Sequence, residues 1–418
     1  MSQSSPGSRA SQASPPLSAP TASPSPPGAA HAHGKPSRRT LPARPRWLML
    51  AIIALLHAYI GWRLLTPLPV APGWKVLGAA WLVASTVLIP LGLMSRAIQR
   101  EPLATLLTWA GMTAIGIFSS LFVLTVLRDV VLGVALAVSG VDAQLATRSA
   151  IIVLVLTAVS TLLGFYNARR LARVVEIDVP IADLPPALKG FTIVQLSDIH
   201  VSSTIRRRYI EAIVEAANEL KPDLVAITGD LVDGGVPALR EHIAPLARLT
   251  SRHGTYVCTG NHEYYSGAPA WVEELRRLGL TVLENEHVVL DHEGAALTIA
   301  GVTDFTAHHF DPAKRSDPMA AAAGSPEGVP RVLLAHQPRS APAAQEAGFD
   351  LQLSGHTHGG QFWPWMYFVP LQQPFVHGLH RLGRLAVYVS RGTGYWGPPK
   401  RFGAPSEITR IRLVPGNA

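Results

Sequence analysis

The sequence predicts an all-α region of four membrane-spanning helices followed by an α/β domain. Three observations lead to this prediction. Only 15% of the 418 residues are charged, whereas a typical soluble domain carries about 25%. Residues 46–173 contain four long apolar runs, and residues 174–418 alternate short apolar runs with helix-like stretches. The single cysteine also excludes an intrachain disulfide framework and a cysteine-rich zinc module.

The N-terminal segment, residues 1–45, is rich in Ser, Pro and Ala and contains no acidic residue. Such a segment cannot bury enough apolar surface to offset the entropy that a chain loses on folding. We therefore expect a disordered tail. The chain is thus predicted to have three parts: a tail over 1–45, a transmembrane region over 46–173 and a catalytic domain over 174–418.

The four apolar runs each approach the roughly 20 residues that a helix needs to cross a bilayer. They cover Trp47–Leu65, Val76–Met94, Leu103–Leu127 and Ala150–Tyr166. We expect four transmembrane helices, with the lipid bilayer as the partner of this region. A shorter apolar piece, Val130–Val138, is interpreted as a re-entrant or interfacial segment. If it crossed the membrane instead, the C-terminal domain would lie on the opposite side.

The formal net charge of +8 arises largely near the N-terminus, because the first acidic residue is Glu101. With four spans, the tail, the 95–102 loop and residues 167–173 share one side of the membrane. Those segments carry Arg38, Arg39, Arg44, Arg46, Arg96, Arg100, Arg169, Arg170 and Arg173. The positive-inside rule then places both termini in the cytoplasm. A twin-arginine export signal at Arg38-Arg39 is the less favoured alternative, and nucleic-acid binding is not expected.

Polar residues of metal-binding type follow the predicted strands. The expected strands are Phe191–Leu196, Leu224–Thr228, Thr255–Thr259, Val332–Ala335, Leu351–Leu353, Leu385–Ser390 and Ile408–Leu413, with a helix over Arg206–Leu220. The first five strands are followed by Asp198 and His200, by Asp230, by Asn261 and His262, by His336, and by His356 and His358. Ligands in open α/β sheets gather at the carboxyl ends of strands. Since mixed Asp and His ligands suit Mn, Fe or Zn, the sequence predicts a metal centre.

These residues, in this order, resemble the five motif blocks of the calcineurin-like metallophosphoesterases over about Val174–Arg412. Gly359-Gly360-Gln361 and the later Ser390–Gly394 segment resemble the membrane-associated bacterial branch of that family, which includes phosphodiesterases and UDP-diacylglucosamine pyrophosphatases. The resemblance implies an αββα sandwich of two mixed β-sheets with a dimetal centre at one edge. It also implies a multi-pass protein of a bacterial inner membrane.

The resemblance further implies a role for each site residue. One metal would be held by Asp198, His200, Asp230 and His358, and the other by Asp230, Asn261, His336 and His356, with Asp230 bridging. The ions would be divalent or trivalent Mn, Fe or Zn. His262 would be catalytic and would not bind metal. Glu263 either orients His262 or has a more distant supporting or solvated role. Asp233 is interpreted as a loop-capping residue rather than as a support of the metal site.

The predicted activity is hydrolysis of a phosphodiester or pyrophosphate bond, in a lipid-linked or nucleotide-linked substrate, by attack of a metal-activated hydroxide. A phosphomonoesterase, a protein phosphatase and a non-catalytic membrane sensor on the same fold are the alternatives. The aromatic run Phe362–Phe368 has two interpretations. It either packs within a β-hairpin or forms an apolar platform that meets lipid beside the site.

Overall fold

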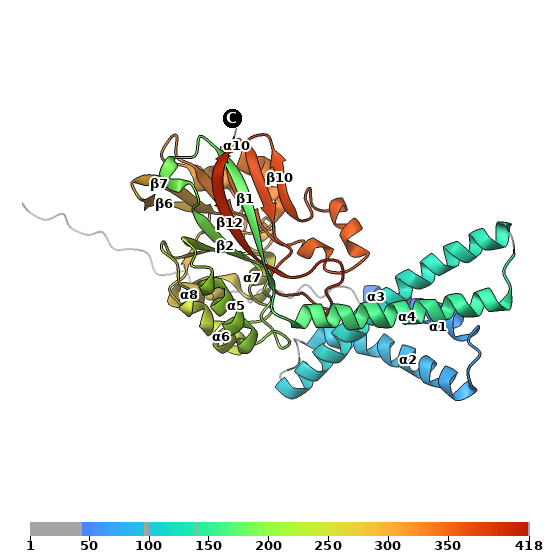
Figure 1. Cartoon of the computed structure of the whole chain (residues 1–418). Coiled ribbons are helices and arrows are strands. Elements are labelled where there is room, and N and C mark those ends of the chain that lie inside the picture. Colours follow the sequence, from blue (N-terminus) through green and yellow to red (C-terminus); the bar gives the residue numbers. More distant parts are fainter. Residues whose placement is uncertain (1–43, 96–97, 99, 139, 417–418) are drawn as a thin grey trace, which may run out of the picture. The chain divides into compact units, whose positions relative to one another are not determined.

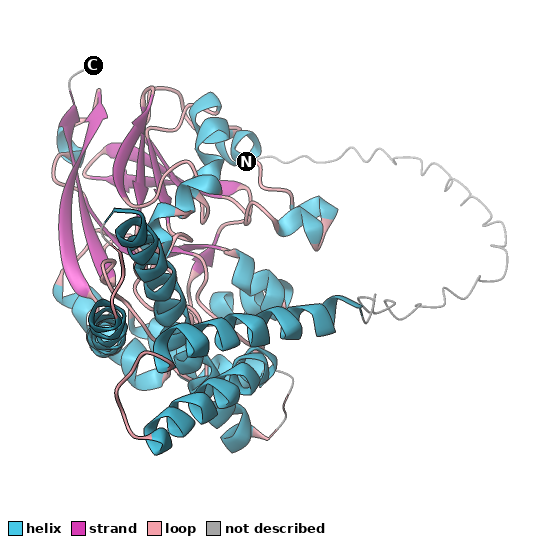
Figure 2. Cartoon of the chain, turned by 90° about the vertical axis from the view of Figure 1, so that its right-hand side faces the viewer, coloured by secondary structure: helices cyan, strands magenta, loops and turns pink. Residues whose placement is uncertain are grey.

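The structure, a computed structural model, describes residues 44–95, 98, 100–138 and 140–416. The predicted tail, 1–45, lies outside these residues except for its last two, which already belong to the first helix. Figure 2 shows that the strands are confined to the C-terminal part of the chain, whereas the long N-terminal segments are helical.

Four long helices form the N-terminal part of the described chain (Figure 1). They are α1 (Arg44–Leu65), α2 (Pro72–Met94), α3 (Glu101–Val138) and α4 (Ala143–Arg169). Each is long and apolar enough to cross a membrane. The prediction of a separate segment over residues 130–138 is wrong, because these residues continue α3 without a break. No proline interrupts this stretch, and the 38 residues of α3 extend about 57 Å, well beyond the ~30 Å hydrocarbon core.

Charged residues within the helices are paired with one another. The Asp129 carboxylate of α3 accepts hydrogen bonds from the Arg63 guanidinium of α1 at 2.8 and 2.9 Å and from the Tyr59 hydroxyl at 2.7 Å. The neighbouring Arg128 donates to Ser149 Oγ on α4 at 2.9 Å. An unpaired charge in an apolar surrounding is costly, so these bonds explain why Arg128 and Asp129 do not end the helix.

The C-terminal part is an α/β domain with two mixed sheets. In strand order, one sheet contains β1 (Arg173–Ala182), β12 (Glu407–Gly416), β2 (Thr192–Leu196), β3 (Leu224–Thr228), β4 (Thr255–Cys258) and β5 (Thr281–Val282). The other contains β10 (Gly378–Leu382), β11 (Leu385–Val389), β9 (Leu351–Ser354), β8 (Arg331–Leu334), β7 (Ala295–Gly301) and β6 (Glu286–His292). Strands β2, β3 and β4 are parallel, as are β7, β8 and β9.

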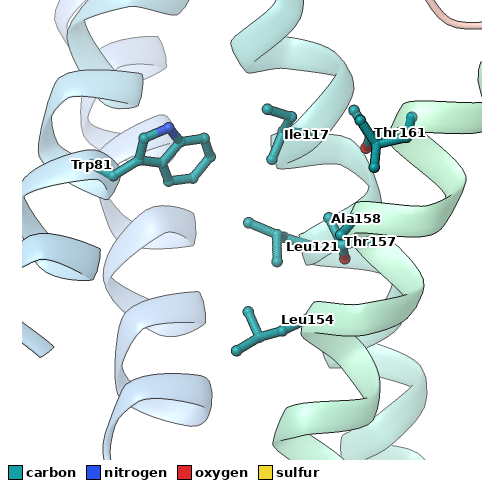
Figure 3. A pocket seen from close by; sticks show the side chains of 8 residues that line it. Trp81, Ile117, Leu121, Leu154, Thr157, Ala158 and Thr161 are labelled. Carbon is teal, nitrogen blue, oxygen red and sulfur yellow. The ribbon is translucent and has the colours of Figure 1, made fainter. Parts of the chain in front are cut away.

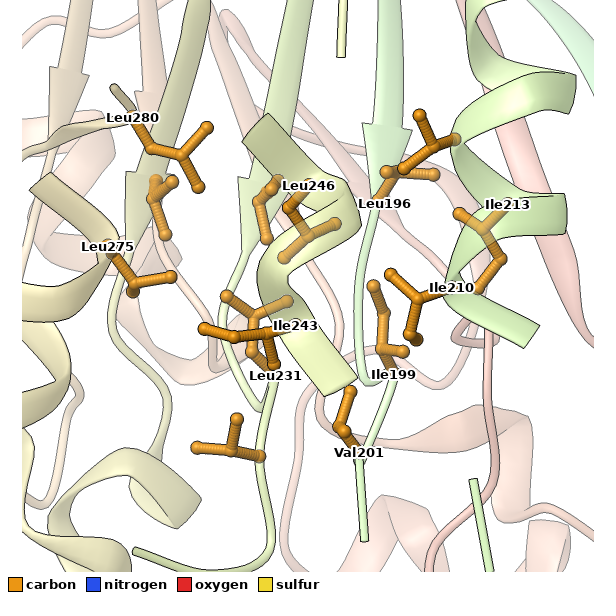
Figure 4. Close-up of a cluster of buried hydrophobic side chains, with 14 of the residues drawn as sticks. Leu196, Ile199, Val201, Ile210, Ile213, Leu231, Ile243, Leu246, Leu275 and Leu280 are labelled. Atoms are coloured by element: carbon orange, nitrogen blue, oxygen red, sulfur yellow. The ribbon is translucent and has the colours of Figure 1, made fainter. Parts of the chain in front are cut away.

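The two sheets pack face to face, and helices cover their outer faces. Apolar side chains of both sheets, such as Ile193 and Leu353, form one buried cluster between them. Helices α5 (Arg207–Glu219), α6 (Val236–Ile243) and α8 (Ala268–Arg277) cover the outer face of the first sheet (Figure 4). Helices α9 (Pro318–Ala322) and α10 (Ala341–Glu346) cover the second. The predicted αββα sandwich is therefore confirmed.

Candidate metal centre

The predicted ligands converge at one edge of the sandwich. Asp198 and His200 follow β2, and Asp230 follows β3. Asn261 and His262 begin the short helix α7 (Asn261–Ser266) after β4, His336 follows β8, and His356 and His358 follow β9. Parallel strands end at the same edge of a sheet, so side chains from five loops reach one small volume. Most of these side chains are buried.

The backbone at this edge adopts an unusual conformation. Five of the candidate ligands, Asp198, His200, Asp230, His356 and His358, have φ between 51° and 69°. Left-handed backbone costs a residue other than glycine roughly 1–2 kcal/mol. Such conformations persist only where the surrounding structure imposes them, and they cluster at functional sites.

Two glycines make room for the carboxylates. A Cβ at Gly260 would collide with Asp230 Oδ1, and a Cβ at Gly355 would collide with Asp198 Oδ2. A Cβ at Gly229 would lie only 2.6 Å from the backbone nitrogen of Gly260. The glycines preceding Asp230, Asn261 and His356 are therefore needed because loops from different strands touch.

Ligand atoms of the described residues form three groups, of which one comprises His200, Asp233 and His262. The other two consist of predicted ligands: one comprises Asp198, His200 and His358, and the other comprises Asp230, His336 and His356. Within these groups, His200 Nε2 lies 3.0 Å from His358 Nε2, and His336 Nε2 lies 3.2 Å from His356 Nδ1. Oδ2 of Asp230 lies 3.1 Å from His336 Nε2 and 3.8 Å from His200 Nε2. The Asp230 carboxylate thus lies between the two groups.

Hydrogen bonds at the far side of two rings direct their Nε2 atoms into the centre. Nδ1 of His336 donates to the carbonyl oxygen of Thr228 at 2.8 Å. Nδ1 of His200 donates to Asp233 Oδ1 at 3.1 Å. A carbonyl or carboxylate oxygen only accepts, so in the neutral rings these bonds place the proton on Nδ1 and leave the Nε2 lone pairs for a metal.

Asp233 also binds the second imidazole of the site. Its Oδ1 lies 2.5 Å from His262 Nδ1, while His262 Nε2 faces Asp230 Oδ2 at 3.9 Å. The interpretation of Asp233 as a loop cap is therefore wrong, because its carboxylate holds two rings of the site. Burial alone would lower the pKa of His262, but the bond to Asp233 and the negative charges of Asp230, Asp233 and Glu263 together outweigh burial and raise it.

Mutual contacts separate the pKa values of the buried groups. Burial raises the pKa of Asp198. Burial acts in the same direction on Asp230, but the neighbouring His336, His262 and His200 together outweigh it and hold the pKa of Asp230 well below its ordinary value. Burial would lower the pKa of His336, but the carboxylates of Asp230, Asp198 and Asp304 together raise it well above its ordinary value. Burial and the neighbouring His336 lower the pKa of His356 to about 3.

The Glu263 carboxylate holds the backbone next to His262. Its carboxylate accepts hydrogen bonds from the N–H groups of Gly260, Asp230 and Leu231 at 2.6, 2.9 and 2.7 Å. Burial, and then the Asp230 charge, raise the pKa of Glu263 to about 7. Glu263 therefore fixes the Asp230 loop, which favours the supporting role over the interpretation that it orients His262.

A buried arginine that the sequence analysis does not identify forms hydrogen bonds to one histidine of the site. Arg401 is fully buried, and its Nη2 lies 2.9 Å from His358 Nδ1. Its Nη1 donates to the carbonyl oxygens of His358 and Arg391 at 3.0 and 2.7 Å. Burial and then the adjacent guanidinium lower the pKa of His358, which keeps that imidazole neutral. A neutral imidazole is the form that binds metal.

The residues present fit a metal centre. Oδ1 of Asn261 is buried and has no hydrogen-bond partner among the described residues. A buried acceptor without a partner is costly, and a cation would satisfy it. The Asp, His and Asn donors around it are of the kind that first-row transition metals prefer.

The aromatic run Phe362–Phe368 follows the site but does not form a β-hairpin. Phe362 is buried, whereas Trp365, Tyr367 and Phe368 are exposed. Trp365 and Tyr367 belong to one short 3₁₀ turn, and Phe368 connects it to the next. The indole Nε1 of Trp365 donates to Ser119 Oγ on α3 at 2.9 Å. The run therefore lies against a candidate transmembrane helix.

Comparison with known proteins identifies the family. Residues 191–360 match the family model described as calcineurin-like phosphoesterase. A transmembrane protein with metallophosphoesterase domain from Danio rerio is 39% identical over 274 residues, which cover 64% of this chain and 63% of that protein. An uncharacterized metallophosphoesterase of Helicobacter pylori is 39% identical over 61% of this chain and 67% of its own length. The uncharacterized metallophosphoesterase YkuE of Bacillus subtilis is 32% identical over 56% and 82%, respectively.

The chain therefore belongs to the calcineurin-like metallophosphoesterase family. The four apolar helices and the relatives named as transmembrane proteins make it a membrane protein. The similarity extends to animal as well as bacterial proteins. The chain spans less than two thirds, 63%, of the length of the Danio rerio relative.

Proposed function

We propose that this protein is a dimetal phosphoesterase that hydrolyses a phosphodiester or pyrophosphate bond. The observation that supports two ions most directly is the position of Asp230 between two groups of ligand atoms. Asp198, His200, Asp230 and His358 would hold one ion. Asp230, Asn261, His336 and His356 would hold the other. Mn, Fe or Zn is the expected metal, from the mixture of nitrogen and oxygen donors.

The chain's own residues would supply positioning and proton transfer. When bound, the ions would polarise the phosphoryl oxygens and lower the pKa of a water molecule. His262 holds Asp233 through Nδ1, so its Nε2 is the atom that faces the reacting centre. Because its pKa is raised, this imidazole would carry a proton and donate it from Nε2 to the leaving oxygen. Asp233 would stabilise the charge of the protonated ring.

The proposed location is a bacterial inner membrane, with four spans and the catalytic domain, residues 174–418, on the cytoplasmic face. The basic residues at the membrane ends of the helices support this orientation. The substrate would be a lipid-linked or nucleotide-linked phosphoester. A membrane-anchored enzyme meets lipid substrates without a search through solution, which favours the lipid-linked class.

The test compares Asp230→Asn and His262→Ala in the detergent-solubilised full chain. We expect wild type to contain about two metal ions per chain and to hydrolyse aryl phosphodiesters. Asp230→Asn should lose metal and activity together, because it removes the carboxylate shared by the two groups. His262→Ala should keep its metal and lose turnover by about 10²–10⁴-fold, the range for acid–base groups.

The matched control is Asp291→Asn, an exposed carboxylate in β6, which should retain metal and activity. Unchanged metal content in Asp230→Asn would refute the ligand assignment. Loss of metal in His262→Ala would make His262 a ligand, together with His200 and Asp233. Aryl monoesters measured in parallel distinguish a phosphodiesterase from a phosphomonoesterase.

A further inference from the structure

One cavity connects the candidate metal centre with the candidate transmembrane helices. It has a volume of about 580 Å³ and is lined by residues of α2, α3 and the loops of the catalytic domain. We call it the helix-side chamber. Its volume lies within the range of about 300–1,000 Å³ typical of ligand pockets.

One end of the chamber is the reaction site. Asp233 and His262 are part of its wall, and His262 Nε2 lies 3.9 Å from Asp230 Oδ2. The rings of Tyr265 and Trp396 flank His262 at centroid distances of 5.1 and 5.7 Å and also line the chamber. A phosphate held by the metal ligands would therefore leave the rest of its substrate at the entrance of this space.

The other end is formed by apolar residues of the membrane helices. Leu93 of α2 and Ala104, Met112 and Ile115 of α3 line it. Leu93 is 52% exposed, on a helix that is apolar enough to span a bilayer. The two hydroxyls in this part of the wall, Ser95 and Thr108, bond to each other at 2.7 Å. This part of the wall therefore favours an apolar occupant over a polar one.

A second groove, between the helices, provides a comparison for the helix-side chamber. It has a volume of about 370 Å³ and lies among α2, α3 and α4 (Figure 3). Trp81, Leu121 and Ala158 are among its lining residues, which include no titratable side chain. It does not include a residue of the metal centre, so it serves as a control site.

We propose that the helix-side chamber binds the alkyl tail of a lipid phosphoester whose phosphate lies at the metal centre. This inference rests on the proposed function and narrows its substrate to the lipid-linked class. The tail would enter between α2 and α3 from the bilayer, and the head group would remain near His262. A nucleotide-linked substrate without a tail would leave the apolar half of the chamber unfilled.

The experiment uses two alkyl p-nitrophenyl phosphodiesters, one with an ethyl and one with a hexadecyl chain, and the full chain in lipid nanodiscs. Both share the same leaving group, so the chemical step is matched. We expect wild type to show a KM at least about tenfold lower for the hexadecyl ester, an effect that burial of about two methylene groups would produce. Ala104→Trp, which fills the chamber, should remove this preference, measured as the ratio of the two KM values. Ala158→Trp, in the second groove, should retain the preference.

A photolabelling arm supplies a readout that does not depend on turnover or on the folding of variants. Hexadecyl phosphate with a diazirine in its chain should label wild-type peptides that contain residues 104–115, and unlabelled hexadecyl phosphate should compete. Hydrolysis of both esters with equal KM, or labelling spread evenly over the helices, would overturn the chamber proposal. Absence of hydrolysis of both esters by wild type would instead refute the proposed function.

Discussion

Asp233 is the residue on which two imidazoles of the site depend. Its Oδ1 accepts hydrogen bonds from His200, a candidate ligand, and from His262, the candidate acid. One carboxylate thus fixes the ring orientation of both and favours the charged form of His262. Nothing in the spacing of the sequence distinguishes such an aspartate from one that caps a loop, because both follow a strand by a few residues.

We predict that Asp233→Asn weakens metal binding and lowers kcat by about 10- to 100-fold, the usual effect of losing a partner of a ligand histidine. KM for a soluble aryl diester should change little, because Asp233 does not hold the substrate. The measurements are metal content after dialysis and steady-state kinetics of the full chain.

The matched control is Asp317→Asn, because Asp317 is a true cap whose carboxylate accepts from Ala320 N–H at 3.0 Å in helix α9. That variant should lose some thermal stability and keep its metal. If Asp233→Asn behaves like Asp317→Asn, with lower stability but normal metal content and kcat, Asp233 is only a cap.

The sequence predicts the ligand-type residues because each stands directly after an apolar run that forms a buried strand. The convergence of Asp198, Asp230 and His336 follows from that pattern and from the common edge of parallel strands. The supporting residues do not follow from it. Glu263 and Arg401 act through backbone groups of distant loops, and these contacts exist only after the sheets have packed.

At the scale of the elements, the sequence does not reveal the edge strands β1, β5, β6 and β10, nor β7, which lies inside the second sheet. Strand β1 contains Glu176, Asp178 and Pro180 and is largely exposed along its first half. Its ten residues pair with β12, more than 200 residues away in the chain. Strands β6 and β10 likewise have partly exposed patterns. Central strands such as β3 are continuous buried apolar runs and are predicted readily.

The segment that follows β11 attaches the catalytic domain to the helices through a buried lysine. Lys400 is 2% exposed, and its Nζ donates to Ser120 Oγ on α3 at 2.6 Å and to Thr161 Oγ1 on α4 at 3.1 Å. A Cβ at Gly164 of α4 would lie only 2.6 Å from Lys400 Cγ. The close approach of this segment therefore requires a glycine on the helix.

We predict that Lys400 makes the stability of the protein depend on pH. Burial lowers its pKa to about 8, below the ordinary value of 10.5. Between these two values the unfolded chain binds more protons than the folded chain, so the free energy of unfolding rises with pH in this window. Relative to Lys400→Met, the wild-type Tm should therefore increase from about pH 8 to about pH 10. Thermal unfolding of both proteins in detergent, over this pH range, measures the difference.

The control for this prediction is Lys189→Met, which removes an exposed lysine of the same domain. Its Tm should follow the wild-type profile throughout. Parallel pH profiles for wild type and Lys400→Met would mean that the ammonium group is not desolvated between the helices.

At the scale of the whole molecule, the side of the membrane on which catalysis occurs depends on a short connection. Helix α4 ends at Arg169 and β1 begins at Arg173, so in the proposed four-span topology the catalytic domain begins where α4 would leave the bilayer. Because residues 130–138 belong to α3, they add no further crossing. An even number of crossings returns the chain to its starting side.

We therefore predict that a reporter fused after Ala418 behaves as cytoplasmic, and that one inserted between Leu68 and Pro69, in the connection between α1 and α2, behaves as exported. The physical reason is the charge difference: arginines such as Arg100 and Arg169 lie at the ends that the positive-inside rule retains in the cytoplasm. Arg63 and Arg128 at the opposite ends are offset by their bonds to Asp129.

Paired fusions to alkaline phosphatase, which is active only after export, and to a fluorescent protein that matures only in the cytoplasm, measure both positions. Phosphatase activity at Ala418, with fluorescence at the 68–69 insertion, would invert the orientation and place the metal centre outside the cytoplasm.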